Sequence, residues 1–468
     1  MYVMQHKKKI HFEISERKIL LRVFDVLFVS AFIFLMDFFF EIEYFDTFFL
    51  NFNHIIVLGF YINIIGTVFE MYDLQVASKQ FQVLQSILLT ASTTVLLFLL
   101  TPVFTPLLPK NRLQIISFYF VVLGALYFWR YLYVTFLASD RFIKNAILIC
   151  DKDQLEALVS GIEKVDPHYK ILGYINSDIQ NQEANLKNDY VPQIEKNAIQ
   201  DFVSNKSISE IVIASQKTDG ITSNLYASLI HLLEKGFIIR EYTQVYESIT
   251  QSIPVQYIAK DFYRYFPFSR SNQNHLYLVI LRFLEIITSL VGLLVGVVIL
   301  PFIMLGNLIG NRGKMFYTQK RVGQNGKVFK ILKLRTMIKN AEKNGAVFSQ
   351  KNDARITIFG KFLRKSRLDE VPQFVNVLKG EMAIIGPRPE RPVFVKEIAQ
   401  IMPFYETRHV IKPGLTGWAQ VNYSYGATID DSLMKLQYDL YYIKHRSIFL
   451  DINIVFKTLS TIIFYRGQ

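Results

Sequence analysis

Long apolar segments dominate the first part of the chain, and their length predicts helices that cross a membrane. Four of them are rich in Phe, Leu, Ile and Val, and each has the length that a helix needs to span the hydrocarbon layer. The second is the weakest candidate. We expect a four-helix transmembrane domain over residues 23–140, with spans near residues 23–40, 54–69, 81–104 and 113–136.

The charges that flank these segments orient them. The head, residues 1–22, is polar and basic, and the exit from the fourth segment meets Arg141 and Lys144. The loop after the first segment, residues 41–46, carries acidic residues and no base. Because basic flanks are retained in the cytoplasm, an even number of spans satisfies both ends. We expect the head and the part of the chain after residue 140 to be cytoplasmic.

Residues 141–265 show a shorter pattern, in which apolar runs of strand length alternate with amphipathic ones. Such alternation predicts a Rossmann-like α/β domain with a parallel sheet. The turn after the first strand, where that fold places a Gly-rich phosphate loop, reads Cys150-Asp-Lys-Asp-Gln154 and has no nucleotide fingerprint. The domain is either a regulatory ligand domain or a scaffold or dimerisation module, and we favour the second. We expect strands at residues 146–150, 171–175, 210–214 and 237–241.

A fifth apolar segment, residues 276–309, contains Arg282, Glu285 and Pro301. Basic residues precede and follow it, so both flanks are expected on the cytoplasmic side. A proline inside a helix costs about 3 kcal/mol unless a kink relieves its clash with the preceding turn. We predict a re-entrant helix that breaks at Pro301 and returns to the same side, with a kinked full span as the alternative.

Composition agrees with a basic membrane protein. Of 468 residues, 51% are hydrophobic and only 19% are charged, and the net charge is +13. Soluble proteins carry about 25% charged residues. The basic excess suits an anionic membrane surface or phosphorylated substrates, and it does not indicate a nucleic-acid binder, because the bases form no reading motif. The single cysteine, Cys150, excludes an intrachain disulfide and fits a reducing cytoplasm.

Two neighbouring acids, Asp369 and Glu370, are the candidates for chemistry. Pro372 favours the first turn of a helix, which places both carboxylates at the helix start. Neighbours on a helix or turn point in different directions, so one acid can attack a substrate while the other holds a metal. The simpler interpretation is a solvated helix start with surface ion pairs. Three nearby bases are expected to keep both acids ionised: Arg364, Lys365 and Arg367.

A series of motifs surrounds this pair. In order they are Gln319-Lys-Arg-Val-Gly323, Lys333-Leu-Arg-Thr-Met337, Leu368-Asp-Glu-Val-Pro-Gln373, Asn376-Val-Leu-Lys-Gly-Glu-Met382, Ile385-Gly-Pro-Arg-Pro-Glu390, Lys412-Pro-Gly-Leu-Thr-Gly-Trp-Ala-Gln-Val-Asn422 and Asp439-Leu-Tyr-Tyr442. The series resembles the bacterial sugar transferases, monotopic phosphoglycosyltransferases that act on polyprenyl phosphate. It implies a catalytic domain over residues 276–468, which includes the re-entrant helix. The segments ahead of it resemble the long-form members that start capsule, exopolysaccharide or O-antigen synthesis.

The resemblance implies a reaction at the bacterial inner membrane, with the catalytic domain facing the cytoplasm. A sugar-1-phosphate moves from a UDP-sugar to undecaprenyl phosphate, UMP is released, and Mg²⁺ is required. By the family pattern, Asp369 attacks the sugar-linked phosphorus and forms a covalent phosphosugar intermediate, while Glu370, together with Asp369, holds Mg²⁺. Four bases match family positions that suit phosphate or nucleotide: Lys333, Arg335, Arg364 and Arg388.

The chain departs from the family pattern after Val421. Many members read Val-Asn-Gly-Arg where this chain has Val421-Asn-Tyr-Ser424, so either Arg408 or Lys412 substitutes for the missing base or the donor is held differently. Leu300 stands where Ser often precedes the helix-breaking proline, which removes one hydrogen bond at the kink. A catalytically inactive scaffold that binds anionic lipid or an assembly partner is the alternative from another class. The sugar, the pathway and a homodimer are left open by the sequence.

Overall fold

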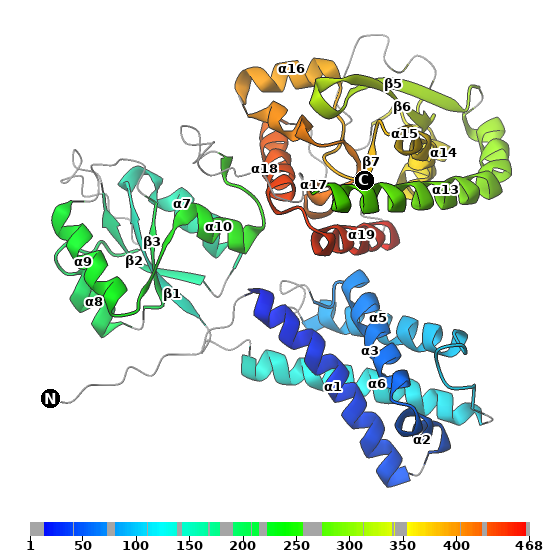
Figure 1. Ribbon diagram of the computed structural model, residues 1–468, viewed down its shortest axis with the longest axis horizontal. Coiled ribbons are helices and arrows are strands. Elements are labelled where there is room, and N and C mark those ends of the chain that lie inside the picture. The colour runs from blue at the N-terminus through cyan, green and yellow to red at the C-terminus, as the bar shows by residue number, and fades with distance from the viewer. Residues whose placement is uncertain are drawn as a thin grey trace. The chain divides into compact units, whose positions relative to one another are not determined.

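The computed structural model of the chain divides into two compact units, Met1–Thr250 and Gln251–Gln468 (Figure 1). Each unit is described by itself. The structure describes residues 14–40, 42–72, 80–109, 111–137, 143–166, 169–177, 191–206, 208–214, 222–255, 274–311, 313–338, 341, 353–402, 404–423 and 428–464. The basic residues expected at 1–13, 141, 260–270 and 312, the acidic Glu41 and the departure at Ser424 lie outside these ranges.

The first unit begins with a bundle of apolar helices. Within it, α1 packs against α3 and α6, and α5 packs against α3 and α6. Phenylalanine fills the core, where the rings of Phe48 and Phe98 stack with their centres 5.6 Å apart and Phe118 packs beside both. The helices are α1 Ile14–Phe40, α2 Glu43–Leu50, α3 Asn53–Val68, α5 Gln80–Leu100 and α6 Arg112–Leu132, which continues as the π-helical turn η1 Tyr133–Leu137.

Length separates α3 from the other long helices of this bundle. The stretches Glu16–Phe40, Val83–Leu100 and Arg112–Thr135 are long and apolar enough to cross a membrane. The α3 helix has 16 residues and therefore spans about 24 Å, less than the hydrocarbon layer of about 30 Å. The predicted second segment is thus an apolar helix, but it is too short for a straight full span. The fourth long apolar helix among the described residues is His275–Asn311, in the second unit.

A buried ion pair joins two helices of the bundle. Arg130 Nη2 of α6 donates a hydrogen bond to Asp25 Oδ2 of α1 over 2.8 Å, and both side chains are fully enclosed. The guanidinium groups of Arg22 and Arg130 lie 5.0 and 5.5 Å from the centre of the Tyr72 ring. Each charge in this apolar surrounding therefore has a partner of opposite charge or an aromatic face beside it.

A four-stranded parallel sheet forms the rest of the first unit, with the strand order β2-β1-β3-β4. All four predicted strands are confirmed as β1 Lys144–Cys150, β2 Tyr169–Asn176, β3 Glu210–Ile213 and β4 Ile238–Glu241. Ile147, Ile149 and Ile211 are completely buried, because helices cover both faces of the sheet and its strands are therefore almost continuously apolar (Figure 1). These helices are α7 Leu155–Glu163, α8 Ile199–Asn205, α9 Ser223–Glu234 and α10 Tyr242–Thr250.

The second unit places two small sheets and short helices beside one long helix, α13 His275–Gly306, which is followed by the π-helical turn η6 Asn307–Asn311. The strands β5 Phe316–Val322 and β6 Val328–Leu334 are antiparallel, and β7 Ala383–Ile385 is parallel to β8 Gly414–Thr416. The other elements are α14 Ile358–Lys365, η8 Leu368–Gln373, α15 Phe374–Lys379, α16 Pro392–Ile401, η9 Tyr405–Val410, α17 Trp418–Asn422, α18 Ile429–His445 and α19 Ile448–Ile463.

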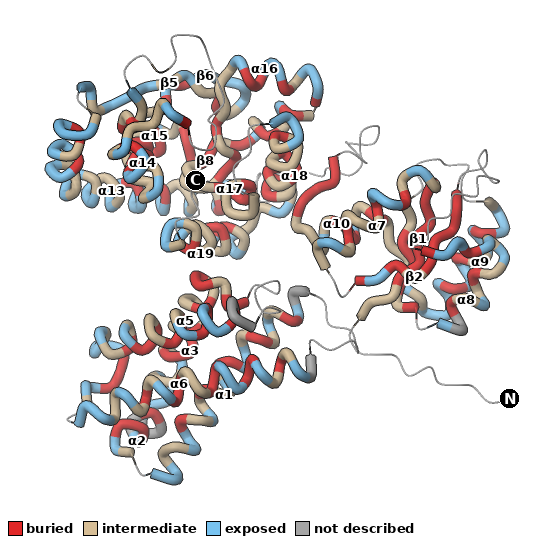
Figure 2. The backbone as a smooth tube through the Cα atoms, turned by 180° about the vertical axis from the view of Figure 1, so that it is seen from behind, coloured by how far each residue is buried: buried red, intermediate tan, exposed pale blue. Residues whose placement is uncertain are grey.

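The α13 helix is apolar and is poorly covered by the rest of its unit. Leu294, Val298 and Phe302 are each more than half exposed, and Figure 2 shows few buried positions along the helix. Pro301 lies inside it, and Figure 1 shows its last part, in pale green, turning away from the direction of the longer first part. Such a helix needs lipid around its apolar side chains. Its re-entrant course stays a prediction.

Candidate functional site

The two candidate acids lie on a short 3₁₀ turn between two helices. The chain leaves α14 at Ser366, and Arg367 adopts a left-handed backbone with φ of 57°. The turn η8 then carries Asp369 and Glu370, and the α-helix α15 begins at Phe374. The predicted helix start at Pro372 is therefore two residues early. Asp369 and Glu370 are only 8% and 7% exposed, so the interpretation as a solvated helix start is wrong.

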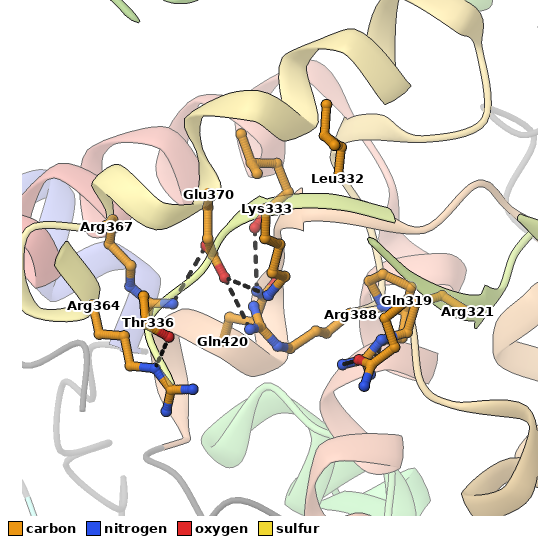
Figure 3. A network of polar contacts seen from close by, with 12 residues as sticks. Gln319, Arg321, Leu332, Lys333, Thr336, Arg364, Arg367, Glu370, Arg388 and Gln420 are labelled. Carbon is orange, nitrogen blue, oxygen red and sulfur yellow. Dashed lines mark hydrogen bonds and ion pairs between the residues drawn. The ribbon is translucent and has the colours of Figure 1, made fainter. Parts of the chain in front are cut away.

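Glu370 is surrounded by bases from three different segments (Figure 3). Arg388 Nη2 donates to Glu370 Oε1 over 2.9 Å, and Lys333 Nζ approaches the same oxygen to 3.4 Å. Arg367 Nη1 lies 3.5 Å from Glu370 Oε2. Burial raises the pKa of Glu370, but the charges of Arg388, Lys333 and Arg367 outweigh it and hold that pKa well below its ordinary value. Glu370 is therefore ionised at any physiological pH.

Asp369 has a different environment although it is the adjacent residue. Among the described residues, none donates a hydrogen bond to its carboxylate. Burial raises the pKa of Asp369 to about 6, the negative charge of Glu370 adds to this effect, and Lys333, Arg364 and Arg367 oppose it. Of the three bases expected to keep both acids ionised, Arg367 contacts Glu370, and Arg364 and Arg367 lower the pKa of Asp369 without outweighing burial. Neighbouring acids with opposite pKa shifts are typical of separate chemical roles.

A small pocket beside Glu370 collects further donors. Its lining includes the cations Arg321, Lys333 and Arg388 together with Gln373. Arg321 Nη1 donates to Pro389 O over 3.0 Å, whereas Arg321 Nε and Gln373 Nε2 are buried and have no hydrogen-bond partner in the described part of the chain. Buried donors without acceptors, gathered with three cations, suit an anionic group such as phosphate.

Sequence reasoning missed two of these pocket residues. Arg321 and Gln373 belong to motifs that were recognised, but neither was singled out. On strand β5 the alternation of side chains gives a signal, because Gln319 and Arg321 lie on one face, and Arg321 Nη2 donates to Gln319 Oε1 over 2.7 Å. For Gln373 the decisive fact is its orphaned amide, which only the three-dimensional structure provides.

The predicted phosphate-binding bases divide into two groups. Lys333 and Arg388 meet at Glu370, and Arg364 lies near Arg367, where its Nε donates to Thr336 Oγ1 over 2.9 Å (Figure 3). Arg335 points elsewhere.

The guanidinium of Arg335 is bound to the end of the membrane helix. Its Nη2 donates to Asn311 O over 2.9 Å, and Asn311 Nδ2 donates back to Arg335 O over 2.8 Å. Arg335 therefore joins the end of β6 to the turn that follows α13, and the structure does not bring it to the acids.

Arg408 lies behind Arg388. It is buried, its Nη2 donates to Arg388 O over 3.0 Å and lies 2.7 Å from Asp439 Oδ2, and its Nη1 donates to Tyr405 Oη over 2.6 Å. These contacts use the guanidinium to hold the Arg388 backbone in place. Because Arg408 is engaged in this way, it is not the substitute for the family's missing base. Burial raises the pKa of Asp439 to about 6, against the lowering effect of Arg408.

The base that contacts Asn422 is Lys457 of α19. Lys457 Nζ donates to Asn422 Oδ1 over 2.6 Å and lies 4.8 Å from the centre of the Trp418 ring. The amine of Lys412, the other expected substitute, lies beside Gly380 at the end of α15. The departure after Val421 is therefore accompanied by a lysine that comes from a different segment and that sequence reasoning did not select.

The acids satisfy part of what a magnesium ion needs. Among the described residues, no group of three or more His, Cys, Asp or Glu side chains could hold a metal by itself. Mg²⁺ takes one or two carboxylates and completes its shell with water and substrate phosphates. Asp369 offers a carboxylate to which no described residue donates a hydrogen bond, whereas both Glu370 oxygens already face cations. The pair therefore fits a metal that arrives with phosphate, with Asp369 as the less encumbered ligand.

Comparisons with known proteins found matches to the second unit. Residues 276–465 match the family model of the bacterial sugar transferases. Over 141 residues, 30% of this chain, the sequence is 44% identical to 79% of a Bacillus subtilis (strain 168) protein, provisionally named undecaprenyl-phosphate N-acetylgalactosaminyl 1-phosphate transferase. The chain belongs to the bacterial sugar transferase family.

Two further relatives of this sugar transferase are longer than the Bacillus subtilis protein. It is 50% identical over 151 residues to the UDP-N-acetylgalactosamine-undecaprenyl-phosphate N-acetylgalactosaminephosphotransferase of Aeromonas hydrophila, a match that covers 32% of this chain and 36% of the relative. It is 41% identical over 180 residues to the UDP-glucose:undecaprenyl-phosphate glucose-1-phosphate transferase of Escherichia coli (strain K12), covering 37% of this chain and 38% of the relative. The matches thus cover less than half of each of these two proteins.

Proposed function

We propose that this sugar transferase moves a sugar-1-phosphate from a UDP-sugar to undecaprenyl phosphate, as the first membrane step of exopolysaccharide, capsule or O-antigen synthesis. The observation that carries the proposal is the asymmetry of the two acids. Asp369 is buried, has no hydrogen-bond donor among the described residues and has a raised pKa, while Glu370 is held ionised by three bases. This arrangement supports a nucleophile beside an electrostatic partner.

The first step would be an attack by an Asp369 carboxylate oxygen on the sugar-linked phosphorus. A new bond forms between that oxygen and phosphorus, the bond from phosphorus to the bridging oxygen of UMP breaks, and UMP departs with the electron pair. Asp369 must be ionised to attack, and a carboxylate with a pKa near 6 is a stronger base than an ordinary one while still mostly charged at neutral pH. Lys333 and Arg388 lie where they can compensate phosphate charge.

In the second step an oxygen of undecaprenyl phosphate attacks the same phosphorus and displaces the Asp369 carboxylate. The lipid then carries a diphosphate-linked sugar, and Asp369 returns to its starting state. Every reactant is an anion, so the three cations of the pocket supply the charge that the approach requires. When bound, Mg²⁺ would be held by Asp369 and Glu370 and would neutralise further phosphate charge.

The donor is proposed from the relatives. The Aeromonas hydrophila protein is named for UDP-N-acetylgalactosamine and the Escherichia coli protein for UDP-glucose. We propose UDP-N-acetylgalactosamine as the donor. The relative named for it is more similar over the matched segment, with 50% rather than 41% identity. Lys457 contacts Asn422, and we expect this base to make the contact to the donor that distinguishes this chain from other family members.

The test is UMP release by the purified full chain in lipid nanodiscs, with undecaprenyl phosphate, Mg²⁺ and a panel of UDP-sugars. We expect release that requires the lipid acceptor for multiple turnovers and is fastest with one donor. Asp430→Asn, a change at an exposed acid on α18, is the matched control and should leave the rate unchanged. Absence of UMP release with every donor would favour the inactive scaffold.

A further inference from the structure

The face of α13 that turns toward the protein is unlike the rest of that helix. Glu285 and Ser289 are buried on it, at 9% and 0% exposure, and Gly292 and Gly296 follow at helical spacing. The remaining surface is apolar and largely exposed. A membrane helix of this pattern meets lipid with its large side chains and meets its own protein with small and polar ones.

The two glycines receive side chains from the segment that bears the acids. A Cβ atom added at Gly296 would lie 2.7 Å from Val371 Cγ1, and one added at Gly292 would overlap the ring of Phe374. Carbon atoms in favourable contact are about 3.5–4.0 Å apart. Only glycine therefore allows Val371 and Phe374 to approach the helix so closely.

These contacts lie directly beside the acids in sequence. Val371 follows Glu370 on η8, and Phe374 begins α15, so both ends of the turn after Glu370 rest on α13. Arg282 of α13 secures the far end of α15, because its Nη1 and Nη2 donate to the carbonyl oxygens of Val377 and Leu378, each over 2.7 Å. A helix end leaves its last carbonyls without intrahelical partners, and of these two oxygens Val377 O also accepts from Gly380 N over 2.9 Å.

We propose that Gly292 and Gly296 are positioning residues that set the place of Asp369 relative to the pocket cations. The membrane helix then supports the turn that carries Asp369 as well as anchoring the protein. The close approach of η8 to α13 places the acid within reach of a membrane-bound acceptor. The proposal rests on the proposed function for its activity readout. The Gly292-Leu-Leu-Val-Gly296 spacing, which in other membrane helices allows a second helix to dock, is filled here by the chain's own Val371 and Phe374.

The same helix provides its own control. Gly306 at the end of α13 and Gly310 in the following turn η6 face Phe359 of α14, and a Cβ added at Gly310 would lie 2.6 Å from Phe359 Cβ. This second contact has the same chemistry but does not border the acids. A third glycine, Gly124 of α6, has no atom within 4 Å of an added Cβ. Alanine variants at Gly296, Gly310 and Gly124 therefore distinguish the effect of crowding beside the acids from the effect of crowding elsewhere and from the effect of alanine without crowding.

The experiment is a size exchange between Gly296 and Val371. Gly296→Ala should lower kcat for UMP release by about tenfold to a hundredfold, because a displacement of about 1 Å can cost a hundredfold. KM for the UDP-sugar should change little, because Arg321 and Arg388 belong to other segments. Adding Val371→Ala should restore most of kcat, since it removes the methyl groups that meet the new Cβ.

The controls define the opposite outcomes. Gly124→Ala should keep wild-type kcat, and Gly310→Ala should lower the thermal midpoint without being rescued by Val371→Ala. An unchanged kcat in Gly296→Ala, or a loss that Val371→Ala does not restore, would overturn the positioning role. If the wild-type protein releases no UMP, the proposed function fails instead. The thermal midpoints of the single and double variants then test the contact between Gly296 and Val371. The stability effects of Gly296→Ala and Val371→Ala should be coupled more strongly than those of Gly310→Ala and Val371→Ala, and equal couplings would refute the contact.

Discussion

Among the places where the described part of the chain buries acid and base together, the helical bundle and the turn η8 use charge differently. In the helical bundle, Asp25 and Arg130 form a direct ion pair of 2.8 Å between two membrane helices. At the turn η8, Glu370 has three bases and the adjacent Asp369 has no hydrogen-bond donor among the described residues. Burial is common to both places, so burial alone does not identify an active site. The unequal sharing of bases between neighbouring acids, next to a pocket with orphaned donors, is the feature that makes η8 the candidate site.

The largest effect expected from this comparison is on the bundle's stability. Arg130→Met leaves Asp25 as an unpaired buried acid, and breaking such a pair is worth about 3–5 kcal/mol. We expect a much lower thermal midpoint in nanodiscs, with kcat per folded molecule close to that of the wild type. Replacing both partners, as in Asp25→Leu with Arg130→Met, should recover much of the midpoint. A proportional loss of kcat in the folded fraction would instead give the pair a catalytic role.

Arg388→Ala tests the other side of the comparison. This change removes the shortest contact to Glu370 and one cation of the pocket. Loss of one preorganised donor lowers kcat by about 10²–10³, or about 2.7–4 kcal/mol. The matched control is Lys396→Ala, which removes an exposed base on α16 and should leave kcat unchanged. Equal rates for the two variants would show that the cluster around Glu370 does not contribute to the reaction.

Glu370→Gln should have a smaller and more specific effect. The amide keeps the shape of the side chain but is a poorer ligand for a hard cation, and it no longer pairs with Lys333 and Arg388. We expect the Mg²⁺ concentration for half-maximal rate to rise by roughly tenfold, equivalent to about 1.4 kcal/mol. Titration of the metal at saturating UDP-sugar measures it. A rate loss that no Mg²⁺ concentration alters would leave Glu370 with only its electrostatic role.

The pH dependence is the smallest of these effects and follows from Asp369. As the pH falls through about 6, the pKa to which burial raises Asp369, the nucleophile is protonated and kcat/KM should decline. The effect on stability has the opposite sense. A carboxyl whose folded pKa lies above its unfolded value binds more protons when folded, so stability falls as the pH rises from about 4 to 6. Asp369→Asn should therefore raise the thermal midpoint at pH 7 and leave it nearly unchanged at pH 4.

Local patterns were sufficient for the strands of the parallel sheet. The run Ala146-Ile-Leu-Ile-Cys150 is a strand because a parallel sheet covered on both faces needs continuous apolar residues, and that property is visible in five consecutive positions. The acids were likewise found from their own neighbourhood. The helix of residues 54–69 was also recognised, and α3 has the predicted length of 16 residues. The error lay in expecting a helix of this length to cross the hydrocarbon layer.

Contacts between distant segments could not be predicted from local sequence patterns. Gly292 and Gly296 look like ordinary members of an apolar membrane helix until Val371 and Phe374 are placed against them. Arg335 has the residue type and the motif of a phosphate ligand, yet its partner is Asn311. Arg408 was expected at the substrate and lies behind Arg388 instead. In each case the residue's role depends on a partner outside its own motif, which a local pattern does not contain.

The most direct test of the central claim is to trap the phosphosugar on the protein. The full chain in nanodiscs is mixed with a UDP-sugar labelled in the sugar and with Mg²⁺ but without undecaprenyl phosphate, then quenched and mapped by peptide mass spectrometry. We predict label on the peptide that contains Asp369, its loss when undecaprenyl phosphate is added, and none in Asp369→Asn. Undiminished label in Asp369→Asn, or label mapped to another residue, would contradict the account.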